Sequence, residues 1–171
     1  MKKNIYLTGF MGCGKTTIGN YLSKKIGRDF LDLDNFIVQK ENRSIENIFE
    51  TDGEEYFRKA ETDYLKEIST LSTKRDRVIG LGGGTILSDK NAGICKKNGV
   101  IIFLELSFEQ SYERIKYSRR PLVMNNSKAA LEEIYNKRLP VYQKNAHFSV
   151  NADNGPFVIV RELKRYLQGI I

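Results

Sequence analysis

Residues 9–16 have the types and spacing that can bind a chain of phosphates, because they read G-x-x-x-x-G-K-T directly after an apolar segment. Glycines in such a loop let successive backbone N–H groups turn toward phosphate oxygens. Lys15 adds a positive charge, and the Thr16 hydroxyl can ligate magnesium. The loop therefore predicts a site for ATP or GTP with Mg²⁺, and the alternative is a glycine-rich turn that binds nothing. We expect the nucleotide to be contacted by Gly12, Cys13, Gly14, Lys15, Thr16 and Thr17.

An acidic side chain is expected near the metal, usually at the end of a neighbouring strand. The apolar segment 78–81 leads into three glycines, whereas Asp32 and Asp34 follow one strand-like segment and Glu105 ends another. Residues i and i+2 of an extended segment face the same way, so Asp32 and Asp34 can enter one site together. We favour this pair, with one acid near the metal and one near a substrate hydroxyl. The alternatives are that the pair caps the following helix, or that Glu105 serves the metal.

Two arginines and a glycine triplet are candidates for binding the second substrate. Arg58 and Glu61 are three residues apart in a helical pattern, so the glutamate can orient the guanidinium. Arg138 precedes Pro140, which should disrupt a helix and leave a second guanidinium available. Together with glycines 82–84, they favour a compact, planar anion such as a carboxylate. The alternative is that both arginines form solvated surface pairs.

The elements that must position these residues alternate between strands and helices. This alternation predicts an α/β fold of three layers, with a central parallel five-stranded sheet covered by helices on both faces. The first helix should bury Ile18, Tyr21, Leu22 and Ile26 and end at Gly27. We expect N-caps at Ser88, Ser107 and Ser127 and a last helix that starts at Pro156. The strand-like segments are 5–8, 30–33, 78–81, 100–106 and 148–151.

Two segments fit the sheet pattern poorly and are predicted insertions at the active-site end. Residues 35–69 are helical in pattern, with an apolar stripe that includes Phe57 and Leu65. Residues 116–127 are polar and have the composition of a mobile lid. We expect residues 1–171 to form a single domain that includes both insertions.

Composition limits the classes of partner. The formal net charge is +7, but basic residues are interleaved with acidic ones, which argues against a nucleic-acid surface. A positive field also suits an enzyme whose substrates are anions. Cys13 and Cys95 lack metal-ligand spacing, and no apolar run is long enough to span a bilayer. We therefore expect a cytoplasmic monomer without nucleic-acid or membrane partners.

The ordered series of motifs resembles the shikimate kinase family of P-loop kinases, in the branch similar to nucleoside monophosphate kinases. The resemblance covers nearly the whole chain. It implies a P-loop kinase fold with a helical substrate-binding insertion and a short lid. It also implies transfer of the ATP γ-phosphoryl group to the 3-hydroxyl of shikimate. The matching residues are the loop 9–19, Asp32 and Asp34, segment 44–49, Gly53, Glu54, Phe57, Arg58, Glu61, Gly82, Gly83, Gly84, Arg120, Pro121, Leu122 and Arg138.

The resemblance also implies roles. Asp34 would orient or deprotonate the hydroxyl, and shikimate would be held by Arg58, Arg138 and glycines 82–84, with Glu61 supporting Arg58. Lys15 and Arg120 would stabilise charge on the transferring group, while Thr16 and Asp32 would hold magnesium. The adenine would lie between Arg114 and the loop that ends at Pro156.

Other functions remain open. A related kinase could act on gluconate or on a nucleoside monophosphate, although we find no candidate base pocket or longer lid for a nucleotide acceptor. A regulatory ATP-binding module that associates with nucleic acid is the alternative from another class.

Overall fold

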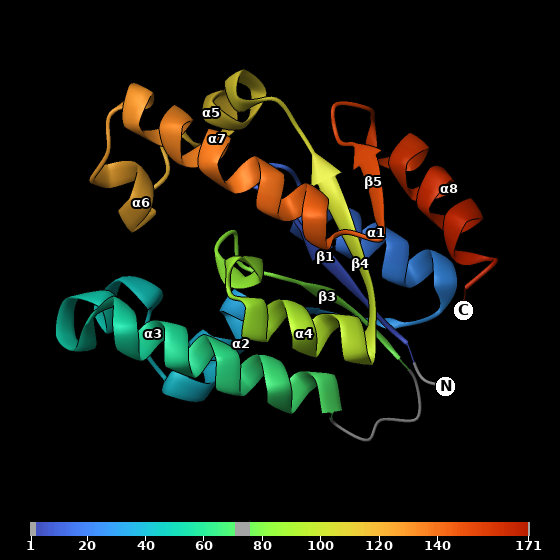
Figure 1. Cartoon of the computed structure of the whole chain (residues 1–171), viewed down its shortest axis with the longest axis horizontal. Coiled ribbons are helices and arrows are strands. Elements are labelled where there is room, and N and C mark those ends of the chain that lie inside the picture. Colours follow the sequence, from blue (N-terminus) through green and yellow to red (C-terminus); the bar gives the residue numbers. More distant parts are fainter. Residues whose placement is uncertain (1–2, 71–75, 171) are drawn as a thin grey trace.

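The computed structural model describes residues 3–70 and 76–170. Within these residues, five parallel strands form one sheet in the order β2-β3-β1-β4-β5 (Figure 1). The strands are β1 (Asn4–Thr8), β2 (Asp29–Asp32), β3 (Arg77–Gly80), β4 (Gly99–Glu105) and β5 (Phe148–Asn151). Each begins and ends within one residue of a predicted segment. The prediction of a five-stranded parallel sheet is therefore confirmed.

Helices form most of the connections between the strands. In chain order they are α1 (Lys15–Ile26), α2 (Leu33–Glu41), α3 (Ile45–Thr70), the 3-10 helix η1 (Thr85–Leu87), α4 (Asp89–Asn98), α5 (Phe108–Ile115), α6 (Pro121–Met124), α7 (Lys128–Asn145) and α8 (Pro156–Leu167). The hydroxyl oxygens of Ser88, Ser107 and Ser127 each accept the N–H of the residue three positions on. These bonds satisfy N–H groups that have no partner inside the helix, so the predicted N-caps are confirmed.

Apolar side chains fill both faces of the sheet, because successive residues of a strand point to opposite sides. Ile5 and Leu7 are buried in one cluster with residues of α1 and α8, and these two helices lie side by side (Figure 1). Tyr6 is buried in a second cluster with residues of α3, α4 and α7. The three-layer prediction is therefore confirmed.

The first helix differs from its prediction at one residue. Ile18 and Leu22 are buried and Gly27 ends the helix at φ 67°, as expected. Tyr21 is 43% exposed and packs against Phe157 at a ring distance of 5.3 Å, so its place on the buried face was wrong. The buried face is instead completed by Gly19 and Ser23. A Cβ at Gly19 would lie 2.1 Å from the Phe30 ring, so only glycine lets β2 approach the helix this closely.

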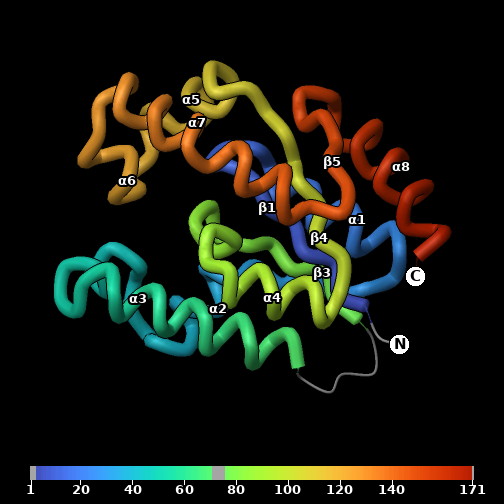
Figure 2. Tube along the Cα trace, viewed as in Figure 1, coloured from blue at the N-terminus to red at the C-terminus, as the bar shows by residue number. Residues whose placement is uncertain are grey.

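The two predicted insertions lie at the same end of the molecule, where α3 and α6 face each other across the carboxyl ends of the strands (Figures 1 and 2). Helices α2 and α3 make up the first segment, and α3 is interrupted at Gly53 (φ 80°, ψ 175°). The second segment contains α6, one turn of helix that begins at Pro121. In the described part of the chain, no helix combines the length and apolar character needed to cross a membrane.

Candidate active site

The phosphate-binding loop joins β1 to α1, at the carboxyl end of the central strand. Gly12 (φ 81°) and Gly14 (φ 95°) adopt backbone conformations that other residues rarely take. Lys15 Nζ donates to the carbonyl oxygens of Gly9 (2.7 Å) and Phe10 (3.1 Å), which keeps the ammonium group over the loop. The loop opens into a cavity of about 350 Å³ that is lined by Met11, Gly12, Gly14, Lys15, Thr16, Thr17, Asp32, Asp34, Leu81, Gly83, Arg114 and Arg120.

Asp32 has two partners. Its Oδ2 accepts from Thr16 Oγ1 at 3.0 Å, and its Oδ1 accepts the N–H of Asn35 at 3.2 Å. Asp32 therefore caps α2, as one of the alternatives expected of the acidic pair, and its other oxygen faces the loop. The carboxylate and the hydroxyl supply two adjacent oxygen ligands of the kind that Mg²⁺ prefers.

Asp34 lies near Asp32 for a different reason than the sequence suggested. The argument from alternating strand residues was wrong, because α2 already begins at Leu33 and Asp34 belongs to its first turn. The structure nevertheless places both acids at the loop cavity. Burial raises the pKa of Asp34 to about 6, and the charges of Asp32 and Glu61 act in the same direction. The cations of Lys15 and Arg120 oppose this shift.

The glycine triplet after β3 lets charged side chains pack against bare backbone. A Cβ at Gly82 would lie 2.8 Å from Asp34 Oδ1, and one at Gly84 would lie 2.8 Å from Arg58 Nη2. Arg58 Nη1 donates to Glu61 Oε2 at 2.9 Å, as the spacing predicted. Only 1% of Glu61 is exposed, so the buried glutamate holds the partly exposed guanidinium of Arg58 in place.

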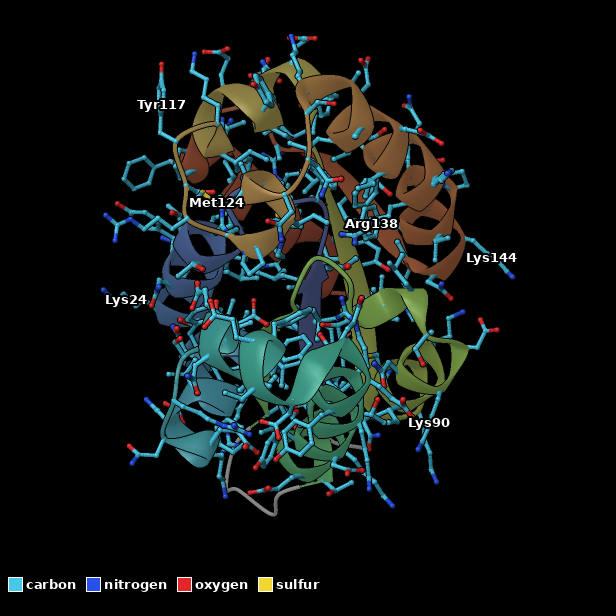
Figure 3. All side chains as sticks on the ribbon, turned by 90° about the vertical axis from the view of Figure 1, so that its left-hand side faces the viewer. Lys24, Lys90, Tyr117, Met124, Arg138 and Lys144 are labelled. Atoms are coloured by element: carbon cyan, nitrogen blue, oxygen red, sulfur yellow. The ribbon has the colours of Figure 1, made fainter. Side chains whose placement is uncertain are left out.

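A second cavity, of about 450 Å³, lies between the insertion, the lid and the glycine triplet. Arg138 is a residue of α7 on the face of the molecule that Figure 3 shows, and its Nη1 is 3.5 Å from the carbonyl oxygen of Gly83. The predicted disruption at Pro140 was wrong, because α7 continues through this residue to Asn145. Charged residues that line the second cavity are Asp34, Glu46, Glu54, Arg58, Glu61, Arg120 and Arg138.

The two cavities meet. Met11, Asp34, Gly83 and Arg120 line both of them, so one carboxylate and one guanidinium stand at the junction. Arg119, the neighbour of Arg120, lines neither cavity. A group that leaves the loop cavity for the second cavity must pass these side chains.

Of the two residues expected to contact the adenine, the structure places only one at the loop cavity. Arg114 Nη1 donates to the carbonyl oxygen of Gly12 at 3.0 Å and lines the loop cavity. Pro156 begins α8 as predicted but does not line that cavity. Glu105 lines a different cavity, of about 660 Å³, together with Ser107, Gln110, Tyr135, Asn151 and Asp153.

Some residues around the second cavity had no role assigned from the sequence. Phe49 and Leu122 belong to the matching motifs, and together with Asn126 they line this cavity through the fold of the insertion and the lid. Thr85, which donates to Glu61, was not predicted at all, because a lone threonine after three glycines has no distinctive pattern.

A nucleotide-type loop joined to a second cavity under a short lid, on a five-stranded parallel sheet, defines a P-loop kinase that acts on a small molecule. A family model described as shikimate kinase matches residues 11–168. The chain therefore belongs to the shikimate kinase family, whose members are ATP-dependent enzymes.

Individual relatives agree with this assignment. Shikimate kinase from Bacillus subtilis is 39% identical over 155 residues, which are 90% of this chain and 82% of the relative. Shikimate kinase from Clostridium botulinum strain Alaska E43 is 36% identical over 98% of both chains. The solved structure of Acinetobacter baumannii shikimate kinase in complex with shikimate superposes with a TM-score of 0.90 at 33% identity, covering 100% of this chain and 96% of the other. Deoxyadenosine kinase from M. mycoides, at 18% identity and a TM-score of 0.63, shares the fold alone.

Proposed function

We propose that this protein transfers the γ-phosphoryl group of ATP to the 3-hydroxyl of shikimate, giving ADP and shikimate 3-phosphate for aromatic amino-acid synthesis. The observation that carries the proposal is the junction of the two cavities at Asp34 and Arg120. Phosphoryl transfer depends chiefly on alignment and on electrostatic stabilisation, and the junction provides both a carboxylate and a cation. Membership of the family supplies the identity of the acceptor.

The acceptor is bound by its carboxylate. Arg58 and Arg138 reach the second cavity from α3 and α7, so their guanidinium groups can bind a carboxylate from two sides. Glycines 82–84 line the same cavity and leave room for a ring close to the backbone. Binding the carboxylate at this end directs a hydroxyl of the ring toward the junction.

Asp34 orients the attacking hydroxyl and accepts its proton. A general base works best when its pKa lies close to the working pH, and the pKa of Asp34 is raised to about 6 by burial. Lys15 and Arg120 both line the loop cavity and are placed to stabilise charge on the transferring group. The lid that carries Arg120 excludes water when it closes, which limits hydrolysis of ATP.

Magnesium fits the donors that face the loop. Thr16 Oγ1 and Asp32 Oδ2 lie 3.0 Å apart, and Mg²⁺ usually binds one or two protein oxygens together with phosphate oxygens and water. No cluster of three or more histidine, cysteine or acidic side chains that could hold a metal occurs among the described residues. When bound, the ion would neutralise negative charge on the phosphates.

The proposed nucleotide contacts are the residues of the phosphate-binding loop and, near the adenine, Arg114 and Pro156. Gly12, Gly14, Lys15, Thr16 and Thr17 line the cavity, and Cys13 belongs to the same loop. Arg114 supports the proposal through its bond to Gly12, whereas Pro156 rests on the family resemblance alone.

We further propose that the protein acts as a cytoplasmic monomer without nucleic-acid partners. Light scattering after gel filtration should give one species near 19.7 kDa, and a larger species would exclude the monomer.

One assay tests the function directly. Purified protein with Mg²⁺ and ATP is offered shikimate, quinate, gluconate and nucleoside monophosphates in separate reactions, and ADP release is coupled to NADH oxidation. We expect ADP release that depends on shikimate, with a phosphate monoester of shikimate detected by ³¹P NMR. Preference for another acceptor, or ADP release independent of any acceptor, would refute the proposal.

A further inference from the structure

Thr85 is the first residue of η1 and is fully buried behind the glycine triplet. Its Oγ1 donates to Glu61 Oε1 at 2.6 Å, and its backbone N–H donates to the carbonyl oxygen of Gly82 at 3.1 Å. Its own carbonyl oxygen accepts from Asn91 Nδ2 at 2.9 Å. All of its polar groups are therefore engaged, and the direction of the hydroxyl is determined by its surroundings.

Glu61 divides its two oxygens between different donors. Oε1 accepts from Thr85, and Oε2 accepts from Arg58 Nη1 at 2.9 Å. Because the glutamate is almost fully buried, solvent cannot readily replace either donor. Arg58 also contacts Glu54, but 67% of that side chain is exposed and it gives the guanidinium little restraint.

Three side-chain oxygen atoms lie around Gly82, close to the position that a Cβ on this residue would occupy. A Cβ at Gly82 would lie 2.8 Å from Asp34 Oδ1, 3.0 Å from Thr85 Oγ1 and 3.2 Å from Glu61 Oε1. Two of these atoms belong to carboxylates, which repel each other, and the third belongs to a hydroxyl group that can donate a hydrogen bond. Since the Thr85 hydroxyl donates to Glu61, it anchors that carboxylate on the side away from Arg58.

We propose that Thr85 is a positioning residue of the acceptor site: its hydroxyl anchors one oxygen of Glu61 so that the other oxygen orients Arg58 toward the acceptor carboxylate. The proposal rests on the proposed function, because it assigns Thr85 a role in binding the same acceptor. Without the hydroxyl, Glu61 is free to turn, and Arg58 loses the fixed partner that keeps its guanidinium in place. Nucleotide binding should be unaffected, because Thr85 does not line the loop cavity.

A purely structural role predicts something different. A buried threonine that only fills space would lower stability when altered, and it would not change acceptor binding selectively. Thr62 offers a matched control, because its hydroxyl donates to the backbone carbonyl oxygen of Arg58 at 3.0 Å and does not contact Glu61. It lies on the same helix as Arg58 and is partly buried, whereas Thr85 is fully buried.

The experiment compares Thr85→Val, Thr85→Ser and Thr62→Val in steady-state kinetics with shikimate and ATP as varied substrates. Thr85→Val should raise KM for shikimate on the order of tenfold, because it removes a hydrogen bond to a charged group. KM for ATP should stay within about twofold, and kcat should change less than KM for shikimate. Thr85→Ser should restore the wild-type KM, and Thr62→Val should leave it unchanged.

A double-mutant cycle identifies the route of the effect. If Thr85 acts through Arg58, Thr85→Val should add almost nothing to the KM increase of Arg58→Ala. Additive effects, an unchanged KM in Thr85→Val, or an equal change in Thr62→Val would overturn the proposal. If Thr85→Val does not fold, as judged by its thermal transition, Thr85→Ala takes its place under the same criteria. Failure of the wild-type protein to phosphorylate shikimate would instead refute the proposed function.

Discussion

Asp34 should destabilise the folded protein at neutral pH, and Asp34→Asn should therefore be more stable than the wild type. The pKa of Asp34 rises from an ordinary 3.8 to about 6, with burial as the largest cause. A folded-state pKa above the unfolded value means that the protonated acid stabilises the fold below about pH 4. This contribution is lost as the pH rises from about 4 to 6. Above that window, the folded protein carries a partly buried carboxylate that the unfolded chain would expose fully to water.

The size of the effect follows from the two pKa values. A difference of about 2, at about 1.4 kcal/mol for each pH unit, corresponds to about 3 kcal/mol. Asparagine has nearly the same shape and cannot ionise, so its variant should avoid this cost. For a chain of this size we expect Asp34→Asn to melt about 6–12 °C higher than the wild type at pH 8. The two proteins should converge near pH 4.

Scanning calorimetry between pH 4 and 8 provides the measurement, with EDTA present and without nucleotide or acceptor, so that neither metal nor ligand alters the charge of Asp34. Glu105→Gln, at the end of β4 and outside both cavities that meet at Asp34, controls for the removal of one negative charge. A stability difference that does not vary with pH, or a wild type that is the more stable protein at pH 8, would refute the reasoning. The same variant should lose turnover by orders of magnitude with nucleotide affinity nearly unchanged.

Other variants test the rest of the site. Arg58→Ala and Arg138→Ala should each weaken shikimate binding by about 1.5–3 kcal/mol, measured by calorimetric titration. An unchanged affinity in both variants would show that the acceptor binds elsewhere. Gly84→Ala should raise KM for shikimate about tenfold, because the added carbon would lie 2.8 Å from Arg58 Nη2. Gly83→Ala, with its nearest neighbours at 3.7 Å or more, should raise it less, and the reverse order in kinetics would contradict this account. Asp32→Asn should increase the Mg²⁺ concentration that gives half-maximal rate, and an unchanged requirement would exclude the residue from the metal site.

The strands and the phosphate loop could be predicted from sequence because their signals are local. A buried parallel strand is a short run of apolar residues, and each of the five runs appears in the structure within one residue of its prediction. The caps at Ser88 and Ser127 depend on a residue three positions away, so they too are encoded within one turn. Signals of this length need no knowledge of tertiary contacts.

Other features depended on packing between distant segments and were missed or wrongly explained. Asp34 was assigned to an extended segment, whereas Asp32 already caps a helix that starts at Leu33. Pro140 was expected to disrupt a helix that in fact continues, since packing of α7 against β4 can offset one lost backbone hydrogen bond. The part played by Thr85 depends on a glutamate 24 positions earlier in the chain. A sequence pattern that spans one or two turns of helix cannot relate residues so far apart.

Glu61 and Asp34 both line the second cavity but have different surroundings, and this difference explains how one protein can use both acids. Glu61 has a guanidinium on one oxygen and a hydroxyl on the other, so its negative charge is compensated within the protein. Burial raises the pKa of Asp34, and the charges of Asp32 and Glu61 act in the same direction. The cations that lower this pKa, Lys15 and Arg120, line the loop cavity. When those cations bind phosphates, they compensate phosphate charge and do less to lower the proton affinity of Asp34. Of these two acids, Asp34 is therefore the one whose charge the protein compensates less, which is the property that a proton acceptor at the junction requires.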